Sequence, residues 1–301
     1  MAPPMPATSF MYIRPPGIRL TACIACIAAL LLSACATAPQ GLHVDTRYTS
    51  ANQDSRVQFL ILHFTAGGFQ SSLRTLTEGG PGGAEVSSHY LVRDKPVEIY
   101  RLVDESRRAW HAGTSYWQGS TNLNAASIGI EIVNPGLVQT AGGPLYAPYP
   151  QAQIDAVIAL CKDIVARHRI RPERILGHSD IQPLNKTDPG PQFPWRQLAQ
   201  AGLILWPDEA LVSEKQVNYQ GPGQLPDAAW FQDQLIRFGF GLARSGQWDM
   251  ATTSTLTAFQ MKYRPARYDG QADAETAALL EVANLPGGMQ RLAPLINGPR
   301  P

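Results

Sequence analysis

The stretch SIGIEIV, residues 127–133, decides the fold that we predict, because it is almost continuously apolar and short. A run of this kind is typical of a strand that is buried on both faces of a sheet. The run VQFLIL, residues 57–62, has the same character. Both runs therefore predict strands at the centre of a covered sheet. Glu131 is the exception within its run, since a buried carboxylate is costly unless it has a partner or a task.

Working outward from these runs, short apolar segments alternate with polar loops and with helical patterns. Strands and helices mixed at this spacing indicate an α/β domain, a β-sheet covered by helices, which we place at residues 48–203. The further strands are predicted at 88–92, 97–102 and 174–178, and the helices at 71–76 and 151–168.

The pattern changes after residue 203. Residues 204–225 contain proline and glycine without a clear period, and we predict a linker there. Residues 226–285 carry apolar side chains at helical spacing, which predicts a small unit of three helices, the last at about 274–283. The tail 286–301 is rich in proline and glycine, and we predict that it is poorly ordered.

The N-terminus indicates export. Two arginines precede an apolar run at residues 20–32 that has the length of a signal-peptide core and is too short to span a bilayer. The run ends in Leu32-Ser33-Ala34-Cys35, which resembles a lipobox and implies cleavage after residue 34 and lipid on Cys35. An ordinary secretory signal with a chance cysteine is the alternative, and Met5 or Met11 is an alternative start. Residues 35–47 are predicted to be a lipidated tether.

Composition narrows the function classes further. The chain has 25 basic and 24 acidic residues and no basic run, so we expect no nucleic-acid partner. Two of its four cysteines lie in the predicted signal, and Cys161 falls on the apolar face of a predicted helix. We therefore predict a buried thiol at Cys161 and no disulfide framework.

Three polar residues suggest a metal centre. His63 ends one predicted strand, and His178 ends another and enters the loop GHSDIQPLNKTDPGP, residues 177–191, in which Asp188 is flanked by proline and glycine. Two imidazoles and one carboxylate are a frequent ligand set of catalytic zinc. Their spacing matches no compact motif such as HExxH, so structural polar residues are the alternative.

Five motifs in a fixed order identify a resemblance: LHFTAGG, SSHYLV, AWHAG, SIGIEIVNP and GHSDI…KTDPGP. Together they resemble the zinc-dependent N-acetylmuramoyl-L-alanine amidases of the amidase 2 group, which share their fold with peptidoglycan recognition proteins. The likeness covers residues 48–200. It implies a mixed central β-sheet covered by helices. With the lipobox and the C-terminal helices, it points to outer-membrane lipoproteins of the family that face the periplasm.

The resemblance also implies roles for particular residues. Zn²⁺ is expected at His63, His178 and Asp188. Glu131 is expected to pass a proton from water to the leaving amine, and Lys186 to stabilise the oxyanion of the intermediate. A structural salt bridge is the alternative for Glu131. The reaction implied is hydrolysis of the amide between the lactyl group of N-acetylmuramic acid, or its anhydro form, and L-alanine of the stem peptide.

Other candidates are weaker. Trp110 and His111 are predicted to line the cleft as substrate contacts, with packing as the alternative for His111. His89 is predicted to be either a polar contact near the cleft or a satisfied core residue. The unit 226–285 resembles a peptidoglycan-binding domain, but its loop at residues 246–249 lacks the usual Asp-Gly turn. Glycan binding and a purely structural role therefore both stay open.

We expect a monomeric enzyme whose partners are peptidoglycan, its muropeptides and, through Cys35, a membrane. A recognition protein without catalysis is the alternative function, and a lipoprotein that only links membrane and wall is a third. The enzyme is favoured because non-catalytic family members tend to lose a zinc ligand. This chain keeps His63, His178 and Asp188 together with Glu131 and Lys186.

Overall fold

The computed structural model describes residues 43–293. The chain divides into a segment that ends at Gln53 and a compact unit that begins at Asp54, and the description below concerns the compact unit. The predicted signal peptide, the lipobox with Cys35 and the last residues of the tail lie outside the described residues. Among the helices of residues 43–293, none is long and apolar enough to cross a bilayer.

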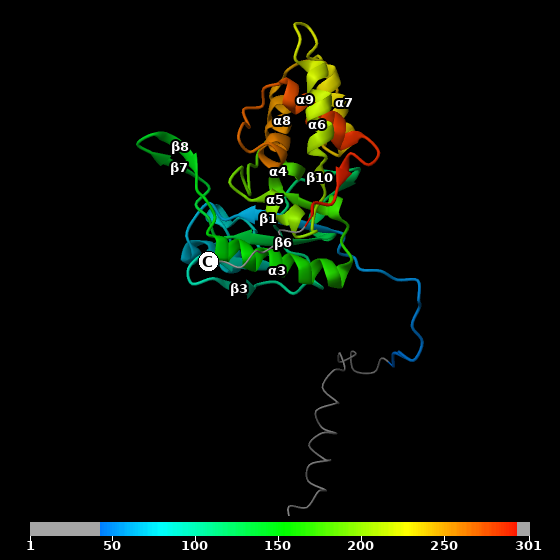
Figure 1. The fold of residues 1–301 in the computed structure, drawn as a ribbon. Helices are drawn as coiled ribbons and strands as arrows, with labels where there is room; N and C mark the ends of the chain where they lie inside the picture. Colours follow the sequence, from blue (N-terminus) through cyan, green and yellow to red (C-terminus); the bar gives the residue numbers. More distant parts are fainter. Residues whose placement is uncertain (1–42, 294–301) are drawn as a thin grey trace, which may run out of the picture. The chain divides into compact units, whose positions relative to one another are not determined.

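A five-stranded mixed sheet forms the centre of the compact unit, as predicted (Figure 1). The strand order is β3-β2-β6-β1-β9; β1, β2, β6 and β9 run parallel, and β3 pairs antiparallel with β2. The central position of β1 and β6 explains their continuous apolar sequences, because both faces of each strand are covered. The bounds are β1 Phe59–Phe64, β2 Tyr90–Arg93, β3 Glu98–Arg101, β6 Ser127–Ile132 and β9 Ile175–Gly177.

Side chains of the central strands alternate between two cores. Leu60 and Ile130 face a core that includes Ile154 and Val157 of helix α3, Gln151–His168, which lies along one side of the sheet in Figure 1. Ile61 faces a second core on the other side. The period of two places the odd-numbered residues of β1 and β6, including the polar side chains of the site, on the second side.

The remaining short elements form the rim of this domain. Helix α2, Phe69–Glu78, follows β1 and is longer than the predicted 71–76. Two small hairpins were not predicted, because their short strands are mostly exposed and do not form an apolar run like those of the sheet. They are β4 Tyr116–Trp117 with β5 Ser120–Thr121, and β7 Leu137–Thr140 with β8 Gly143–Tyr146. Helices α4, His178–Ile181, and α5, Trp195–Gln200, lie above the sheet in Figure 1. The 3₁₀ turns are η1 Pro81–Gly83, η2 Leu123–Ala125, η3 Pro172–Arg174 and η4 Val217–Tyr219.

The three helices predicted beyond residue 226 are present as α7 Ala228–Phe238, α8 Met250–Tyr263 and α9 Ala274–Asn284. The prediction of an irregular segment at 204–225 was wrong, because it contains α6, Glu209–Gln216, whose first amides are capped by Asp208. Its apolar face is too short to show a period, and packing against α9 stabilises it. The tail is ordered at β11, Met289–Gln290, which pairs with β10, Trp206–Pro207.

We call α6 to α9 the C-terminal helical unit. It shares the second core with the sheet, because Phe231, Leu235 and Phe259 of the unit pack in one cluster with Ile61 and Leu176 of β1 and β9. A shared core of this kind fixes the unit on the sheet domain, whereas a polar contact would leave it free to move.

Candidate active site

The sheet assembles the site at one edge. Strands β1, β6 and β9 run parallel, so their carboxyl ends meet there. The register pairs His63 of β1 with Glu131 of β6, and β9 ends at Gly177, directly before His178. This edge of a parallel sheet is the usual place for a site in α/β proteins.

His63, His178 and Asp188 converge as a group that could hold a metal ion, and their ligand atoms all lie within 4.8 Å of one another. The Nδ1 atoms of His63 and His178 are 3.0 Å apart. Oδ2 of Asp188 lies 3.0 Å from the first Nδ1 and 3.1 Å from the second. All three side chains are buried. Two residues of one loop and a third that lies more than a hundred positions earlier in the sequence thus present three donor atoms to one point.

The protonation of this cluster suits a cation. Burial, together with the neighbouring His178, lowers the pKa of His63 from 6.5 to about 4. Burial alone would raise the pKa of Asp188, but the imidazoles of His178 and His63 lower it well below its usual range. Metal ligands must be deprotonated, and at neutral pH His63 is neutral and Asp188 is ionised.

A backbone hydrogen bond joins the two segments of the loop that carries two of the three ligands. The amide of Ser179 donates a hydrogen bond of 2.9 Å to the carbonyl of Asp188. Gly177 allows the two segments to approach, because a Cβ at this position would stand 2.7 Å from Cδ of Pro189. The proline and glycine residues of the loop therefore serve close backbone packing, which explains a composition without a helical or strand period.

His111 lines the cleft, as predicted, and its ring nitrogens are held by neighbouring protein groups. Nε2 of His63 is 3.0 Å from Nδ1 of His111, and Nε2 of His111 is 3.0 Å from Oγ of Ser127. The hydroxyl of Ser127 donates to the carbonyl of Leu123. If Nδ1 of His63 is free to bind a metal, its Nε2–H donates to His111, whose own Nε2–H donates to Ser127. Both ring nitrogens of His111 are therefore used by the protein.

The other two residues predicted as substrate contacts, His89 and Trp110, differ in their burial. His89 is fully buried; its Nδ1 accepts from the amide of Gly129, and its Nε2 donates to the carbonyl of Arg107. It is thus the satisfied core residue, the second of the two predicted alternatives. Trp110 is 43 % exposed and lines the cleft, and the guanidinium of Arg108 lies 4.1 Å from the centre of its ring. Trp110 and His111 both line the cleft, and contact with a substrate stays a prediction for each of them.

A cleft of about 540 Å³ opens over the ligand cluster. Glu131, His178, Lys186 and Asp188 line it, together with Trp110 and residues of helix α2. Burial raises the pKa of Glu131 well above its usual value, the charge of Asp188 adds to this rise, and Lys186 opposes it. Oε2 of Glu131 is buried without a hydrogen-bond partner. Within residues 43–293, the structure shows no ion pair of Glu131, so the salt-bridge alternative has no support.

Sequence reasoning missed the groups that position the predicted residues. Oδ1 of Asn124 accepts the amides of His111 and Ala112 and so fixes the loop that carries His111. Gly129 leaves room for the His111 ring, because a Cβ there would stand 2.4 Å from its Cγ. A glycine in a buried strand does signal a close approach of another group. The sequence could not show which group approaches.

Comparison with known proteins gives consistent matches. The family model described as N-acetylmuramoyl-L-alanine amidase matches residues 53–191, and that of a putative peptidoglycan binding domain matches residues 224–280. The N-acetylmuramoyl-L-alanine amidase AmiD of Escherichia coli is 43% identical over 269 residues, which cover 84% of this chain and 94% of that protein. The 1,6-anhydro-N-acetylmuramyl-L-alanine amidase AmpD of Enterobacter cloacae is 38% identical over 110 residues, 36% of this chain and 54% of that protein.

Solved structures agree in fold. The structure of the Escherichia coli AmiD in complex with anhydro-N-acetylmuramic acid-L-Ala-D-gamma-Glu-L-Lys has a TM-score of 0.70 at 42% identity, with 81% of this chain and 95% of that chain covered. That of AmpDh3 from Pseudomonas aeruginosa has a TM-score of 0.72 at 36% identity and covers 81% of this chain and 98% of that chain.

Proposed function

The chain belongs to the N-acetylmuramoyl-L-alanine amidase family, and we propose that it uses a zinc ion at His63, His178 and Asp188 to cut peptidoglycan stem peptides from their sugar. The bond cleaved is the amide between the lactyl group of N-acetylmuramic acid, or its anhydro form, and L-alanine. The observation that carries the proposal is the convergence of three buried ligands with an unpartnered Glu131 in one cleft. A protein that only binds peptidoglycan would not need this combination of metal ligands and a buried carboxylate.

The donor set fits zinc. Two imidazole nitrogens and one carboxylate oxygen are typical of catalytic zinc, whereas magnesium and calcium prefer oxygen ligands alone. His178 and Asp188 of the cluster line the open cleft, so the protein supplies three ligands and leaves a side accessible to water and substrate. When bound, zinc would supply Lewis-acid activation of water and of the amide carbonyl.

Glu131 is placed to move the proton. Its carboxylate stands beside His63 in the sheet register and lines the cleft, where a water can donate to it, and its buried Oε2 has no hydrogen-bond partner in the protein. It accepts a proton as the water oxygen bonds to the carbonyl carbon. It then delivers this proton to the alanine nitrogen as the C–N bond breaks, which leaves a lactyl carboxyl group and a free amine. The raised pKa of Glu131 suits both transfers near neutral pH.

Lys186 supplies positive charge at the mouth of the cleft, two residues before Asp188. Negative charge develops on the carbonyl oxygen during the attack, and a nearby ammonium stabilises it more than it stabilises the neutral substrate. Trp110, exposed in the same cleft, offers an apolar face to the sugar or the peptide.

The location proposed is the outer membrane, with the enzyme facing the periplasm. The support is the sequence Leu32-Ser33-Ala34-Cys35, and Ala36 stands where an aspartate commonly signals retention in the inner membrane. Lipid on Cys35 would hold the protein stably at the membrane, since several acyl chains anchor a protein firmly whereas a single chain binds only marginally. A monomer completes this proposal, in which a domain at about 48–203 is followed by the C-terminal helical unit, which begins at α6 and not at the predicted residue 226.

Three variants test the function and separate chemistry from metal binding. His178→Ala should lose zinc and activity together. Glu131→Gln and Lys186→Ala should keep one zinc per chain while turnover falls about 100-fold or more. Lys162→Ala, which removes an exposed lysine of α3 that does not line the cleft, is the control and should stay active. Wild-type turnover in Glu131→Gln, or full zinc in His178→Ala, would refute these roles.

A further inference from the structure

A buried lysine of the C-terminal helical unit reaches the sheet domain. Lys262 of α8 is only 4% exposed. Its Nζ donates a hydrogen bond of 2.7 Å to Oδ2 of Asp180 in α4 and one of 3.2 Å to the carbonyl of Ile175 in β9. Lysine is rarely buried unless it is paired, so this arrangement requires an explanation.

The partner of Lys262 holds the backbone from which a proposed zinc ligand extends. Asp180 lies two residues after His178, and its Oδ2 also accepts the amide of Gly177, directly before His178, at 2.8 Å. Ile175 begins β9, three residues before His178, and Asp180 lies within α4, two residues after it. The ammonium of Lys262 thus ties together both sides of the turn that presents His178.

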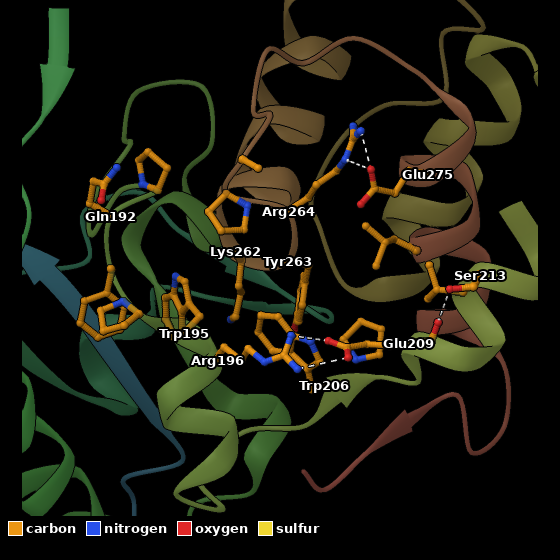
Figure 2. A pocket seen from close by; sticks show the side chains of 18 of the residues that line it. Gln192, Trp195, Arg196, Trp206, Glu209, Ser213, Lys262, Tyr263, Arg264 and Glu275 are labelled. Atoms are coloured by element: carbon orange, nitrogen blue, oxygen red, sulfur yellow. Dashed lines mark hydrogen bonds and ion pairs between the residues drawn. The ribbon is translucent and has the colours of Figure 1, made fainter. Parts of the chain in front are cut away.

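The same lysine contacts a tryptophan that lies against Gly177, where the segments of the two loop ligands meet. Nζ of Lys262 lies 4.2 Å from the centre of the Trp195 ring. Trp195 packs against Gly177, because a Cβ on this glycine would stand 3.2 Å from Cζ2 of Trp195. The same Cβ would stand 2.7 Å from Pro189, the residue after Asp188. Figure 2 shows Lys262 between Trp195 and Tyr263, at a cavity of about 660 Å³ between the sheet domain and the helical unit.

We propose that Lys262 is a positioning residue of the metal site, so that the C-terminal helical unit completes the catalytic scaffold of the domain on which it packs. The ammonium fixes Asp180 and Trp195, and these in turn fix the segments that carry His178 and Asp188. This inference rests on the proposed metal site. The competing role is that the ion pair merely holds the two parts together, which would affect stability but not metal binding.

Lys262→Met separates the two roles, because it keeps the length of the side chain and removes the charge. The matched control is Arg264→Met, two residues along the chain. Arg264 pairs with Asp273 and Glu275 inside the helical unit, so its loss destabilises that unit without touching the turn (Figure 2). Zinc affinity is measured by competition with a chelator, and the geometry of the site by the visible spectrum of the cobalt-loaded protein. Melting temperature, kcat and KM complete the comparison.

For Lys262→Met we expect zinc binding about tenfold weaker, a changed cobalt spectrum and a lower kcat at nearly constant KM. Lys262→Arg should restore part of the affinity. Arg264→Met should lower the melting temperature and leave zinc affinity at the wild-type value. Wild-type zinc affinity in folded Lys262→Met would overturn the proposal, as would an equal loss of affinity in Arg264→Met.

Lys262→Met leaves the carboxylate of Asp180 buried and unpaired, which is strongly destabilising. The double variant Asp180→Asn/Lys262→Met removes both charges and should fold, since neutral replacement of a buried ion pair is often tolerated. It too should bind zinc about tenfold more weakly, and wild-type affinity would overturn the proposal. If the wild-type protein bound zinc but did not hydrolyse its peptidoglycan substrate, only the amidase function would be refuted. The zinc and cobalt measurements would still decide the role of Lys262.

Discussion

Replacing Gly129 by alanine tests the series of hydrogen bonds behind His63 without changing any residue that forms these bonds. An added Cβ would stand 2.4 Å from Cγ, 2.6 Å from Nδ1 and 2.7 Å from Cδ2 of His111, whereas ordinary contacts are 3.4–4 Å. The ring must therefore move by about 1 Å, which is the difference between these values. Because its bonds to His63 and Ser127 are 3.0 Å long, a shift of this size breaks at least one of them.

The expected cost has two parts. Overpacking in a core and the loss of a buried hydrogen-bond partner each lower the free energy of unfolding by about 1–3 kcal/mol. Loss of the group that orients a metal-binding imidazole typically lowers metal affinity by about 10- to 100-fold. We therefore expect Gly129→Ala to melt earlier, to bind zinc more weakly and to turn over more slowly. Thermal melts and chelator competition measure the first two effects.

A second substitution shows whether Gly129→Ala weakens zinc binding by displacing the ring of His111. In a His111→Ala background the new methyl group enters the space that the ring has left, so Gly129→Ala should then cost little more in zinc affinity. The control is Gly68→Ala, because a Cβ at this exposed position meets nothing within 4 Å. Wild-type zinc affinity in Gly129→Ala, or an effect that is equally large with and without His111, would refute the reasoning.

Three further predictions concern metal, pH and location. Zinc at 1,000 times its dissociation constant should stabilise the folded protein by about 4 kcal/mol, so a chelator should lower the melting temperature; the same melting temperature with and without chelator would count against a bound metal. The unfolded chain takes up a proton on His63 near pH 6.5 and the folded protein only near pH 4, so metal-free protein should lose up to about 3 kcal/mol as the pH falls between these values. His63→Asn should flatten this dependence, and a wild-type curve that is already flat would contradict it. Cys35→Ser should release the protein from membranes, and native protein free in the periplasm would disprove the anchor.

Elements with a clear local pattern were predicted well. Helix α3 occupies the predicted residues 151–168, and β6 differs from its prediction by one residue. Both elements have enough apolar positions to show their period and face. Helix α6 was missed because Leu211 and Val212 alone do not define a stripe, although Asp208 before it is a typical N-cap.

The site shows a different limit. The residue types of His63, His178 and Asp188 indicated a metal centre, but their distances in sequence did not, and only the likeness of five ordered motifs brought them together. The structure confirms them as a group that could hold a metal ion. The roles of His111 and Lys262 depend on contacts across the fold, which no local pattern contains.

The central claim is zinc-dependent cleavage of one particular bond, and mass spectrometry of a purified anhydromuropeptide tests it most directly. The protein is incubated with this substrate as zinc-loaded enzyme, after removal of zinc by a chelator, and after zinc is returned. We predict that the zinc-loaded and restored samples yield the free anhydro sugar with its lactyl carboxyl group and an intact stem peptide that begins with L-alanine, while the chelated sample yields neither. An uncut substrate in all three samples, equal cleavage with and without zinc, or products cut at a sugar linkage or within the peptide would contradict the claim.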